Sequence, residues 1–231
     1  MNRRDIFSRS IAFWGEEKQD LLAKKTIFIA GVGAVGCVVA EILLRAGIGR
    51  LYLADRGFTD PPDLNRQALY TVNDLGKPKV STAGQRLKSM TGQTEVIPLE
   101  VNIGEDDISG ALSGCEGVAD CLDNFPSRFA LEESLTKDMF MVSGAILRDY
   151  GQVTTVVPGR TVSLRELYGG FKHVPKTVPV IAPIVFCLGS LMAQEILNNI
   201  WGEPQLQNTI LVAGLAGFCF DLVPLTPTEN P

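Results

Sequence analysis

The chain has 231 residues, 45% of them hydrophobic and 20% charged, a composition that excludes a disordered or collagen-like protein. Its formal charge of -5 argues against a broad surface for nucleic acid or anionic membrane, because both surfaces draw on an excess of Lys and Arg. We therefore expect one domain over residues 1–231, with no nucleic-acid partner and no membrane partner.

The N-terminal sequence and the cysteines indicate a cytoplasmic protein. The N-terminus has no apolar segment ending in small residues, as a secretory signal has. The longest apolar run, residues 178–193, is shorter than the roughly 20 residues of a bilayer span, and it predicts a buried helix. The five cysteines are odd in number and lie in apolar surroundings, which is typical of buried thiols in a reducing compartment: Cys37, Cys115, Cys121, Cys187 and Cys219. No two are spaced as C-x-x-C, so we expect no zinc.

The first half of the chain predicts alternating strands and helices. Residues 1–25 are expected to form an N-terminal helical segment. A strand, a helix and a second strand follow at 26–31, 34–47 and 50–55. The next expected elements alternate helix and strand: 74–92 with Asp74 as N-cap, 94–101, a short helix in 105–116, 117–123, and 125–138 with Pro126 in its first turn.

The second half predicts an antiparallel extension of the sheet. Residues 139–146 and 151–159 alternate apolar and polar side chains, as antiparallel strands do. A polar segment, 160–179, is expected to be a variable loop near the substrate, and a helix at 182–201 and a final pair of strands close the chain. The fold class is therefore α/β: a Rossmann-like, doubly wound mixed sheet, parallel in its N-terminal part and antiparallel in its C-terminal strands.

A glycine motif indicates a nucleotide site. The stretch "GVGAVG" places Gly31, Gly33 and Gly36 between the first expected strand and the following helix. Such glycines let the backbone turn tightly and approach phosphate, while the helix N-terminus supplies N–H donors. Asp55 ends the second strand, where a carboxylate can accept ribose hydroxyls. These features do not distinguish NAD from ATP.

Cations and a second acid favour ATP. Arg66 in "LNRQ", Lys79 in "GKPK" and, less directly, Arg9 in "FSRS" are expected near the carboxyl edge of the sheet. A triphosphate needs such cations because charge grows on the bridging oxygen when its α–β bond breaks. Asp123 and Asn124 in "DNFPSR" are expected to follow the fourth strand and face the same crevice. One carboxylate together with phosphate oxygens and water is a usual way to hold Mg²⁺.

These stretches resemble the ThiF/MoeB/HesA family, the bacterial relatives of ubiquitin-activating enzymes. The similarity covers nearly the whole chain and is weakest between residues 160 and 179. It is carried by several stretches in a fixed order: "FSRSIAFWGEEKQDLL", "IFIAGVGAVG", "LYLADRGFTDPPDLNRQALYTVNDLGKPK", "CLDNFPSR" and "VSGAILRDYGQVTTVVPG".

The resemblance implies a role for each matching residue. Asp55 would bind the ATP ribose, Arg66 and Lys79 would contact the phosphates, and Asp123 would coordinate Mg²⁺. Gln67, with Asn65 in the same "LNRQ" motif, would lie in the nucleotide pocket. Arg9 would reach the phosphates of the neighbouring subunit, which implies a homodimer. Arg9, Arg66 and Lys79 could instead be solvated surface charges.

The chain departs from the family pattern at three places. Asp63 stands where the family has Asn and brings a negative charge near the phosphates, unless it points away or binds metal. Gly57 replaces the second acid of the usual D-x-D. The zinc-binding C-x-x-C pairs and the loop cysteine are missing, and Cys187 falls in an apolar helix, where a structural thiol is expected.

The resemblance implies an enzyme that adenylates a carboxylate, and the missing loop cysteine predicts that the chemistry stops before a thioester. The substrate would be the C-terminal Gly-Gly of a ubiquitin-like sulfur carrier protein or, alternatively, a small carboxylate. His173, the one histidine, is expected at the surface rather than in catalysis. The loop at 160–179, with Tyr168, Gly169, Gly170 and Phe171, could form a lid over a small acid, a clamp on an extended peptide tail, or a poorly ordered crossover. Two other classes remain open: an NAD-dependent oxidoreductase, and a non-catalytic scaffold that binds ATP or a carrier.

Overall fold

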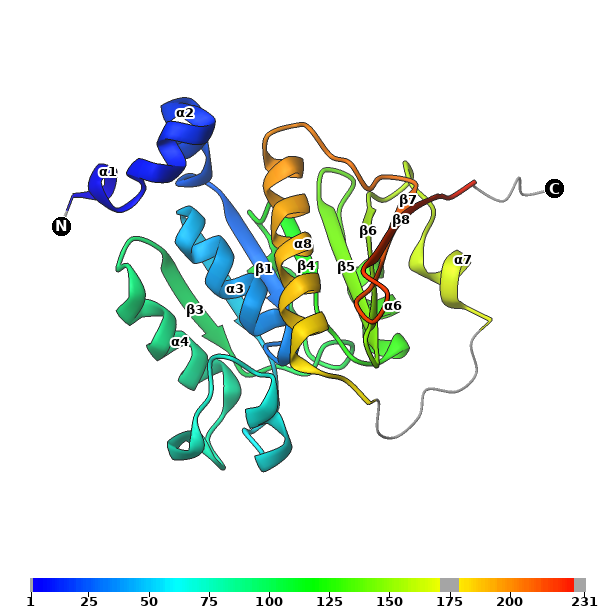
Figure 1. Ribbon diagram of the computed structural model, residues 1–231, viewed down its shortest axis with the longest axis horizontal. Coiled ribbons are helices and arrows are strands. Elements are labelled where there is room, and N and C mark those ends of the chain that lie inside the picture. Colours follow the sequence, from blue (N-terminus) through cyan, green and yellow to red (C-terminus); the bar gives the residue numbers. More distant parts are fainter. Residues whose placement is uncertain (1, 171–178, 227–231) are drawn as a thin grey trace.

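The fold is organised around one eight-stranded mixed sheet, seen in a computed structural model that describes residues 2–170 and 179–226 (Figure 1). The strand order is β3-β2-β1-β4-β5-β6-β7-β8. The strands have these bounds: β1 Thr26–Ala30, β2 Arg50–Ala54, β3 Glu95–Leu99, β4 Gly117–Asp120, β5 Phe140–Leu147, β6 Tyr150–Val156, β7 Thr209–Gly214 and β8 Cys219–Pro224. Strands β1 to β5 pair in parallel and β5 to β8 antiparallel, which confirms the predicted α/β class and mixed sheet.

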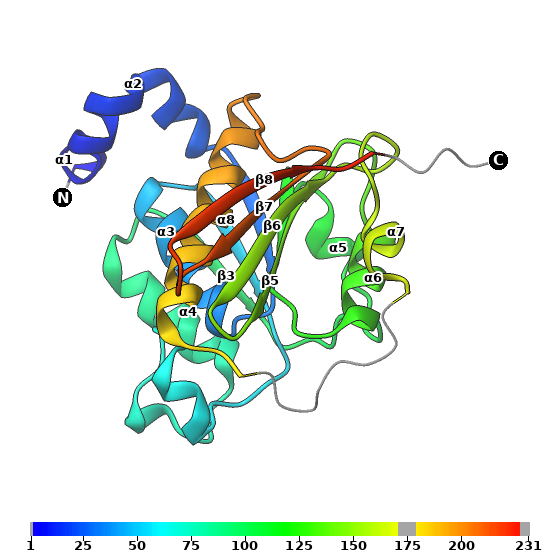
Figure 2. The ribbon, with the colours of Figure 1, turned by 45° about the vertical axis from the view of Figure 1, so that its right-hand side comes forward.

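Helices cover both faces of the parallel part. In Figure 2, α3, α4 and α8 lie on one side of the sheet, and α5, α6 and α7 lie on the other. The helices have these bounds: α1 Arg3–Ile6, α2 Ser8–Leu22, α3 Ala34–Ala46, α4 Lys79–Met90, α5 Ser109–Leu112, α6 Phe125–Glu133, α7 Leu164–Tyr168 and α8 Ala182–Ile200, with short 3₁₀ helices at Pro61–Asn65 and Val72–Asp74. Helices α1 and α2 form the expected N-terminal helical segment.

The strand order places a crevice at one edge of the sheet. From β1 the chain proceeds to β2 and β3 on one side, and then returns to β4 on the other side of β1. All five residues of β1 are buried, as expected for a central strand covered on both faces. In open parallel sheets, ligands bind beyond the carboxyl ends of the strands at the point where the order reverses. Here that point lies beyond β1 and β4.

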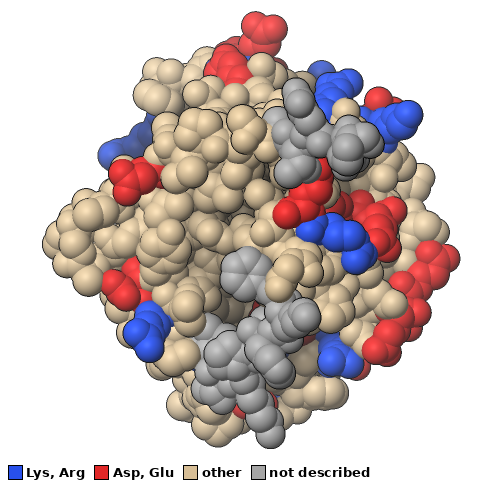
Figure 3. Space-filling view, turned by 90° about the vertical axis from the view of Figure 1, so that its right-hand side faces the viewer, with Lys and Arg blue, Asp and Glu red and all other residues tan. Residues whose placement is uncertain are grey.

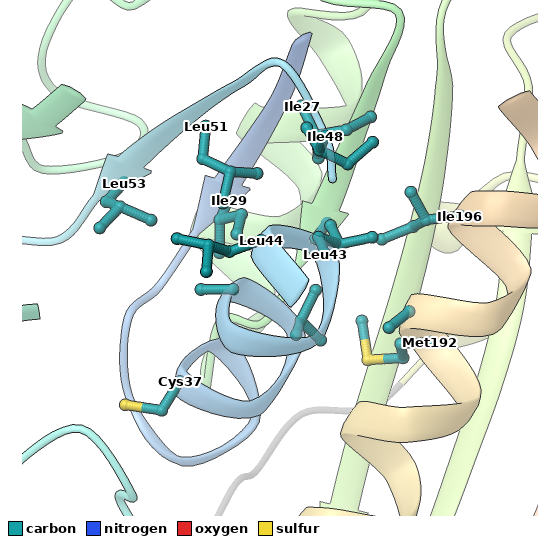
Figure 4. Close-up of a cluster of buried hydrophobic side chains, with 14 of the residues drawn as sticks. Ile27, Ile29, Cys37, Leu43, Leu44, Ile48, Leu51, Leu53, Met192 and Ile196 are labelled. Atoms are coloured by element: carbon teal, nitrogen blue, oxygen red, sulfur yellow. The ribbon is translucent and has the colours of Figure 1, made fainter. Parts of the chain in front are cut away.

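Two apolar clusters hold the layers together. One joins α3 and α8 to the sheet, and Figure 4 shows Leu43 of α3 beside Ile196 of α8, with Ile29 and Leu51 contributed by the strands. The second lies on the opposite face and is built from strand residues such as Phe28 with Leu131 of α6. Because each fully buried aliphatic side chain contributes roughly 1.5–3 kcal/mol, these clusters fix the strands on which the crevice depends.

Strands β7 and β8 are much less covered than the parallel strands. Every residue of β8 is exposed, and Phe218, Phe220 and Leu222 are at least half exposed. The side of the molecule that carries these strands shows a broad area without Lys, Arg, Asp or Glu (Figure 3). Large exposed apolar patches are typical of surfaces that bind other molecules.

The structure corrects the boundaries of two predicted elements that carry site residues. The helix expected from residue 74 begins at Lys79, because Pro78 is extended (ψ 133°) and Gly76 has a positive φ of 75°. Asp74 therefore does not cap it and belongs to a separate 3₁₀ helix. The strand expected at 117–123 ends at Asp120, so Asp123 follows it in a loop rather than ending it.

The structure also corrects two predictions outside the crevice. The segment expected to be a loop at 160–179 contains α7, which starts with a capping box between Ser163 and Glu166. The helix expected at 125–138 ends at Glu133. Over residues 2–170 and 179–226, no helix is both long and apolar enough to cross a membrane.

Candidate functional site

A cleft of about 670 Å³ lies beyond the carboxyl ends of β1, β2 and β4. Most of the residues expected at a nucleotide site line it, although they come from five separate stretches of the chain: Gly31, Gly33, Asp55, Arg66, Gln67, Lys79, Asp123 and Asn124. The sheet topology therefore brings together residues that lie up to 93 positions apart in the sequence.

Three glycines shape the turn between β1 and α3. Gly31 has a φ of 87°, which a residue with a side chain rarely adopts. A Cβ at Gly36 would overlap the backbone oxygen of Gly31, so Gly36 allows α3 to pack closely and does not itself line the cleft. A Cβ at Gly33 would meet only Gln67 Nε2, at 3.9 Å. The space in front of Gly33 is therefore open toward the cleft, where a phosphate can approach backbone N–H groups.

Asp55 is fixed at the rim by the backbone around it. Its Oδ2 accepts a hydrogen bond from Val32 N at 2.8 Å, and its Oδ1 accepts one from Gly57 N at 2.7 Å. A Cβ at Gly57 would lie 3.0 Å from Asp55 Oδ1, so the glycine at this position keeps the approach open. Each carboxylate oxygen has a second lone pair, so the geometry still allows hydroxyl groups to bind.

Arg66 and Gln67 each have a buried polar atom without a partner among the described residues. Arg66 Nη1 donates to Pro62 O at 2.6 Å and to Asn65 Oδ1 at 2.9 Å, but its Nε has no acceptor. Gln67 Nε2 donates to Asp63 Oδ1 at 2.5 Å, and its Oε1 has no donor. Buried polar atoms are nearly always paired, so these two atoms mark positions where a ligand or water is expected.

Lys79 enters the cleft from the first residue of α4. Its ammonium lies 3.1 Å from Asp63 Oδ2, and its side chain is only 14% exposed. The segment before it folds back on itself, because Thr59 N donates to Lys77 O at 2.9 Å and Lys79 N donates to Gly57 O at 2.9 Å. Sequence reasoning left Asp63 unexplained, and the structure shows that it binds the cations of the cleft.

Tyr70 joins this segment to the glycine turn, a role that sequence reasoning missed. Its buried hydroxyl donates to Val32 O at 2.7 Å, directly after Gly31. Burial raises the pKa of Tyr70 far above its usual value, so the hydroxyl stays protonated and keeps this bond. Tyr70 therefore links the segment that carries Arg66 and Lys79 to the glycine turn at the cleft.

Asp123 and Asn124 lie in the loop between β4 and α6. Asn124 caps α6 by accepting a hydrogen bond from Ser127 N at 2.9 Å, and its Nδ2 donates to Asp123 Oδ1 at 3.2 Å. Asp123 is exposed, and its Oδ2 has no partner among the described residues. A single exposed carboxylate suits Mg²⁺, which is bound by one or two carboxylates plus phosphate oxygens and water.

A buried ion pair supports this loop, and sequence reasoning did not identify it. Arg128 Nη1 lies 2.9 Å from Asp120 Oδ2, and the two side chains are 7% and 0% exposed. Arg128 Nη2 donates to Gly144 O at 2.7 Å and also to Leu122 O, the residue before Asp123. The sequence did contain a signal for this pair. Asp120 ends the apolar stretch "GVAD", and a buried carboxylate needs a cationic partner nearby.

Several predicted residues lie outside the cleft. Arg9 is an exposed residue of α2 and does not line the cleft of its own chain. Asn65 is exposed and contacts Arg66 rather than the cleft. Cys187 lies in α8, half-buried, and burial raises its thiol pKa. His173 and Phe171 lie outside the described residues.

The sequence suggested that all five cysteines are buried, but the structure shows that they are not. Cys37 and Cys115 are buried, and burial raises the pKa of each to about 12. Cys121 lines the cleft, and burial raises its pKa still further, so its thiol is not a nucleophile at neutral pH. Cys219 is exposed on β8, which corrects the prediction for that residue.

Comparison with known proteins gives one consistent family. A model of the ThiF family matches residues 7–230. The chain is 31% identical to the sulfur carrier protein ThiS adenylyltransferase of Bacillus subtilis over 82% of its own length and 58% of that protein's. It is 29% identical to the molybdopterin-synthase adenylyltransferase of Salmonella typhimurium, and the match covers 87% of this chain and 82% of that protein. It is 31% identical to protein HesA, vegetative, of Trichormus variabilis, and the match covers 90% of this chain and 79% of that protein.

Solved structures share the fold. The crystal structure of PaaA superposes with a TM-score of 0.81 at 17% identity, covering 96% of this chain and 83% of that one. E. coli MccB in complex with ATP superposes with a TM-score of 0.78 at 21% identity, covering 99% and 73%. At these identities the likeness shows the doubly wound fold and no more.

Proposed function

The chain belongs to the ThiF family, and from this premise we propose that it is an ATP-dependent adenylyltransferase that activates a carboxylate. One observation carries the proposal: a single cleft combines the glycine turn, Asp55, Arg66, Lys79 and Asp123. A dinucleotide site explains the turn and Asp55 but leaves the cations and Asp123 without a role. Relatives at about 30% identity over most of the chain are named adenylyltransferases, which supports this choice.

In the proposed reaction, the substrate carboxylate attacks the α-phosphorus of ATP, giving an acyl adenylate and releasing pyrophosphate. A carboxyl group with an ordinary pKa of about 4 is ionised at neutral pH, so the step needs no general base. Rate enhancement then rests on orienting the two substrates and on stabilising the charge that develops on the leaving group.

The cleft residues take complementary roles in this proposal. The backbone at Gly33 and the N-terminus of α3 receive the phosphates, and Asp55 accepts hydrogen bonds from the ribose hydroxyls. Arg66, through its unpartnered Nε, and Lys79 stabilise the pyrophosphate group as it leaves. Asp123 would hold Mg²⁺, which when bound offsets charge on the phosphate oxygens.

We further propose that the carboxylate is the C-terminal Gly-Gly of a ubiquitin-like sulfur carrier protein and that the enzyme is a homodimer. One relative is named an adenylyltransferase of a sulfur carrier protein, and the exposed apolar surface around Phe220 and Leu222 is what a protein partner would cover. In the dimer, Arg9 of one subunit would reach the phosphates held by its partner. Adenylation of a small carboxylate is the second candidate.

Exchange of labelled pyrophosphate into ATP tests the proposal. Exchange should appear only when the acid substrate is added, and it should fall by at least about 100-fold in Arg66→Ala, because one transition-state donor is lost. Arg45→Ala, which removes an exposed arginine that does not line the cleft, serves as the matched control and should retain activity. Tight NADH binding without exchange would refute the proposal, and a panel of carrier proteins and small acids separates the two substrate classes.

A further inference from the structure

Asp63 is a buried carboxylate placed among the cations of the cleft. Its side chain is 11% exposed, and it lines the cleft beside the residues that it contacts. Oδ2 lies 3.1 Å from Lys79 Nζ and accepts a hydrogen bond from Asp60 N at 3.1 Å. Oδ1 accepts a hydrogen bond from Gln67 Nε2 at 2.5 Å and lies 3.8 Å from Arg66 Nη2. One acid therefore contacts three side chains that face the cleft.

These contacts fix the orientation of Gln67 and the position of Lys79. A carboxylate only accepts hydrogen bonds, so the amide of Gln67 must present its nitrogen to Asp63. Its Oε1 is then left as the buried acceptor without a partner among the described residues. A lysine side chain is flexible, and a buried counter-ion holds its ammonium at one place before any ligand binds.

Asp63 also changes the net charge that a phosphate group meets. Both Lys79 and Arg66 lie within 4 Å of its oxygens, so part of their positive charge is already offset. A phosphate entering the cleft competes with Asp63 for the same cations and is repelled by its charge. In a partly buried site this repulsion is only weakly screened by salt.

We propose that Asp63 is a positioning residue that fixes Lys79 and Gln67 and, by its charge, limits how tightly the cleft holds phosphate groups. This inference rests on the proposed function, because a weakly held pyrophosphate leaves readily after the adenylate forms.

Asp63→Asn tests the inference, because it removes the charge and keeps an oxygen that can accept from Asp60 N. We measure binding of adenosine, ADP, ATP and inorganic pyrophosphate by calorimetry. The variant should bind ATP and pyrophosphate about tenfold more tightly and ADP about threefold more tightly, with adenosine within about twofold of the wild type. The apparent KM of pyrophosphate in the exchange assay should fall in parallel.

Asp74→Asn is the matched control. Asp74 is another buried acid of the same segment, and it pairs with Arg86 at 2.9 Å and Lys77 at 3.6 Å, but it does not line the cleft. Asp74→Asn should leave the differences in affinity between adenosine, ADP and ATP as they are in the wild type. If Asp63→Asn does not fold, Asp63→Ser, whose hydroxyl can still accept from Asp60 N, is measured in its place.

The outcomes separate this inference from the proposed function. An equal effect on adenosine and ATP marks a purely structural residue and overturns the inference. Weaker pyrophosphate binding in the variant also overturns it and indicates a metal ligand instead. If the wild type binds no ATP while Asp63→Asn gains affinity for pyrophosphate, the proposed function fails and the inference stands.

Discussion

The buried pair between Arg128 and Asp120 gives the strongest stability prediction. Arg128→Met keeps the length and apolar stem of the side chain but leaves Asp120, which is 0% exposed, without its cation. Breaking a buried ion pair by removing one partner costs about 3–5 kcal/mol. For a chain of this size, that corresponds to a fall in melting temperature of roughly 10 °C.

Urea and thermal unfolding followed by circular dichroism measure this cost. Arg4→Met is the matched control, because Arg4 forms an exposed ion pair with Glu16, with side chains 73% and 61% exposed. Exposed pairs contribute about 0–1 kcal/mol, so this variant should remain close to the wild type. Arg128→Met should also lose pyrophosphate exchange, because Arg128 holds the carbonyl of Leu122 beside Asp123.

A double-mutant cycle isolates the pair. Asp120→Asn in the Arg128→Met background removes the unpaired buried charge, while Ser143 can still donate to the new side chain as it now does to Asp120 at 2.7 Å. The double variant should be about 2 kcal/mol more stable than the sum of the two single changes predicts. Additive effects, or a loss below about 1 kcal/mol in Arg128→Met, would refute the assignment of a buried ion pair.

Three other predictions concern packing, pH and the dimer. Gly36→Ala should destabilise the protein by about 3 kcal/mol or more, because its Cβ overlaps a backbone oxygen, whereas Gly110→Ala, with open space around it, should be neutral or stabilising in the same denaturation assay. A threonine hydroxyl lowers the pKa of Asp74, so this carboxylate stabilises the fold above its unfolded pKa, and the stability difference from Asp74→Asn should disappear as pH falls below about 4. Arg9→Ala and Arg66→Ala should each be inactive alone, and mixed subunits should recover about a quarter of wild-type exchange; no recovery would contradict a site shared across the dimer.

Local sequence patterns predicted the parallel core well. The apolar run ending at Gly31, the helical spacing after it and the acid at Asp55 follow from rules that act over a few residues, and the structure confirms each element. Strand alternation likewise predicted the antiparallel hairpin of β5 and β6.

Boundaries next to the cleft were harder to predict, because apolar character continues past the point where pairing stops. Residues 117–123 remain mostly apolar, yet β4 ends at Asp120, where the side chain turns inward to Arg128. The helix that carries Lys79 begins five residues later than its polar pattern suggested, because Pro78 and Gly76 fix a turn.

The sequence by itself determined the fold class, the glycine turn and the identity of the cations, because short-range periodicity and spacing encode them. Only the tertiary structure decided which acid pairs with these cations and how the side chains are oriented in the cleft. Asp63 lies sixteen residues before Lys79 in the chain, but the return of residues 57–79 on themselves brings the two side chains to 3.1 Å. Such a contact depends on the path of the whole loop, which no local pattern specifies.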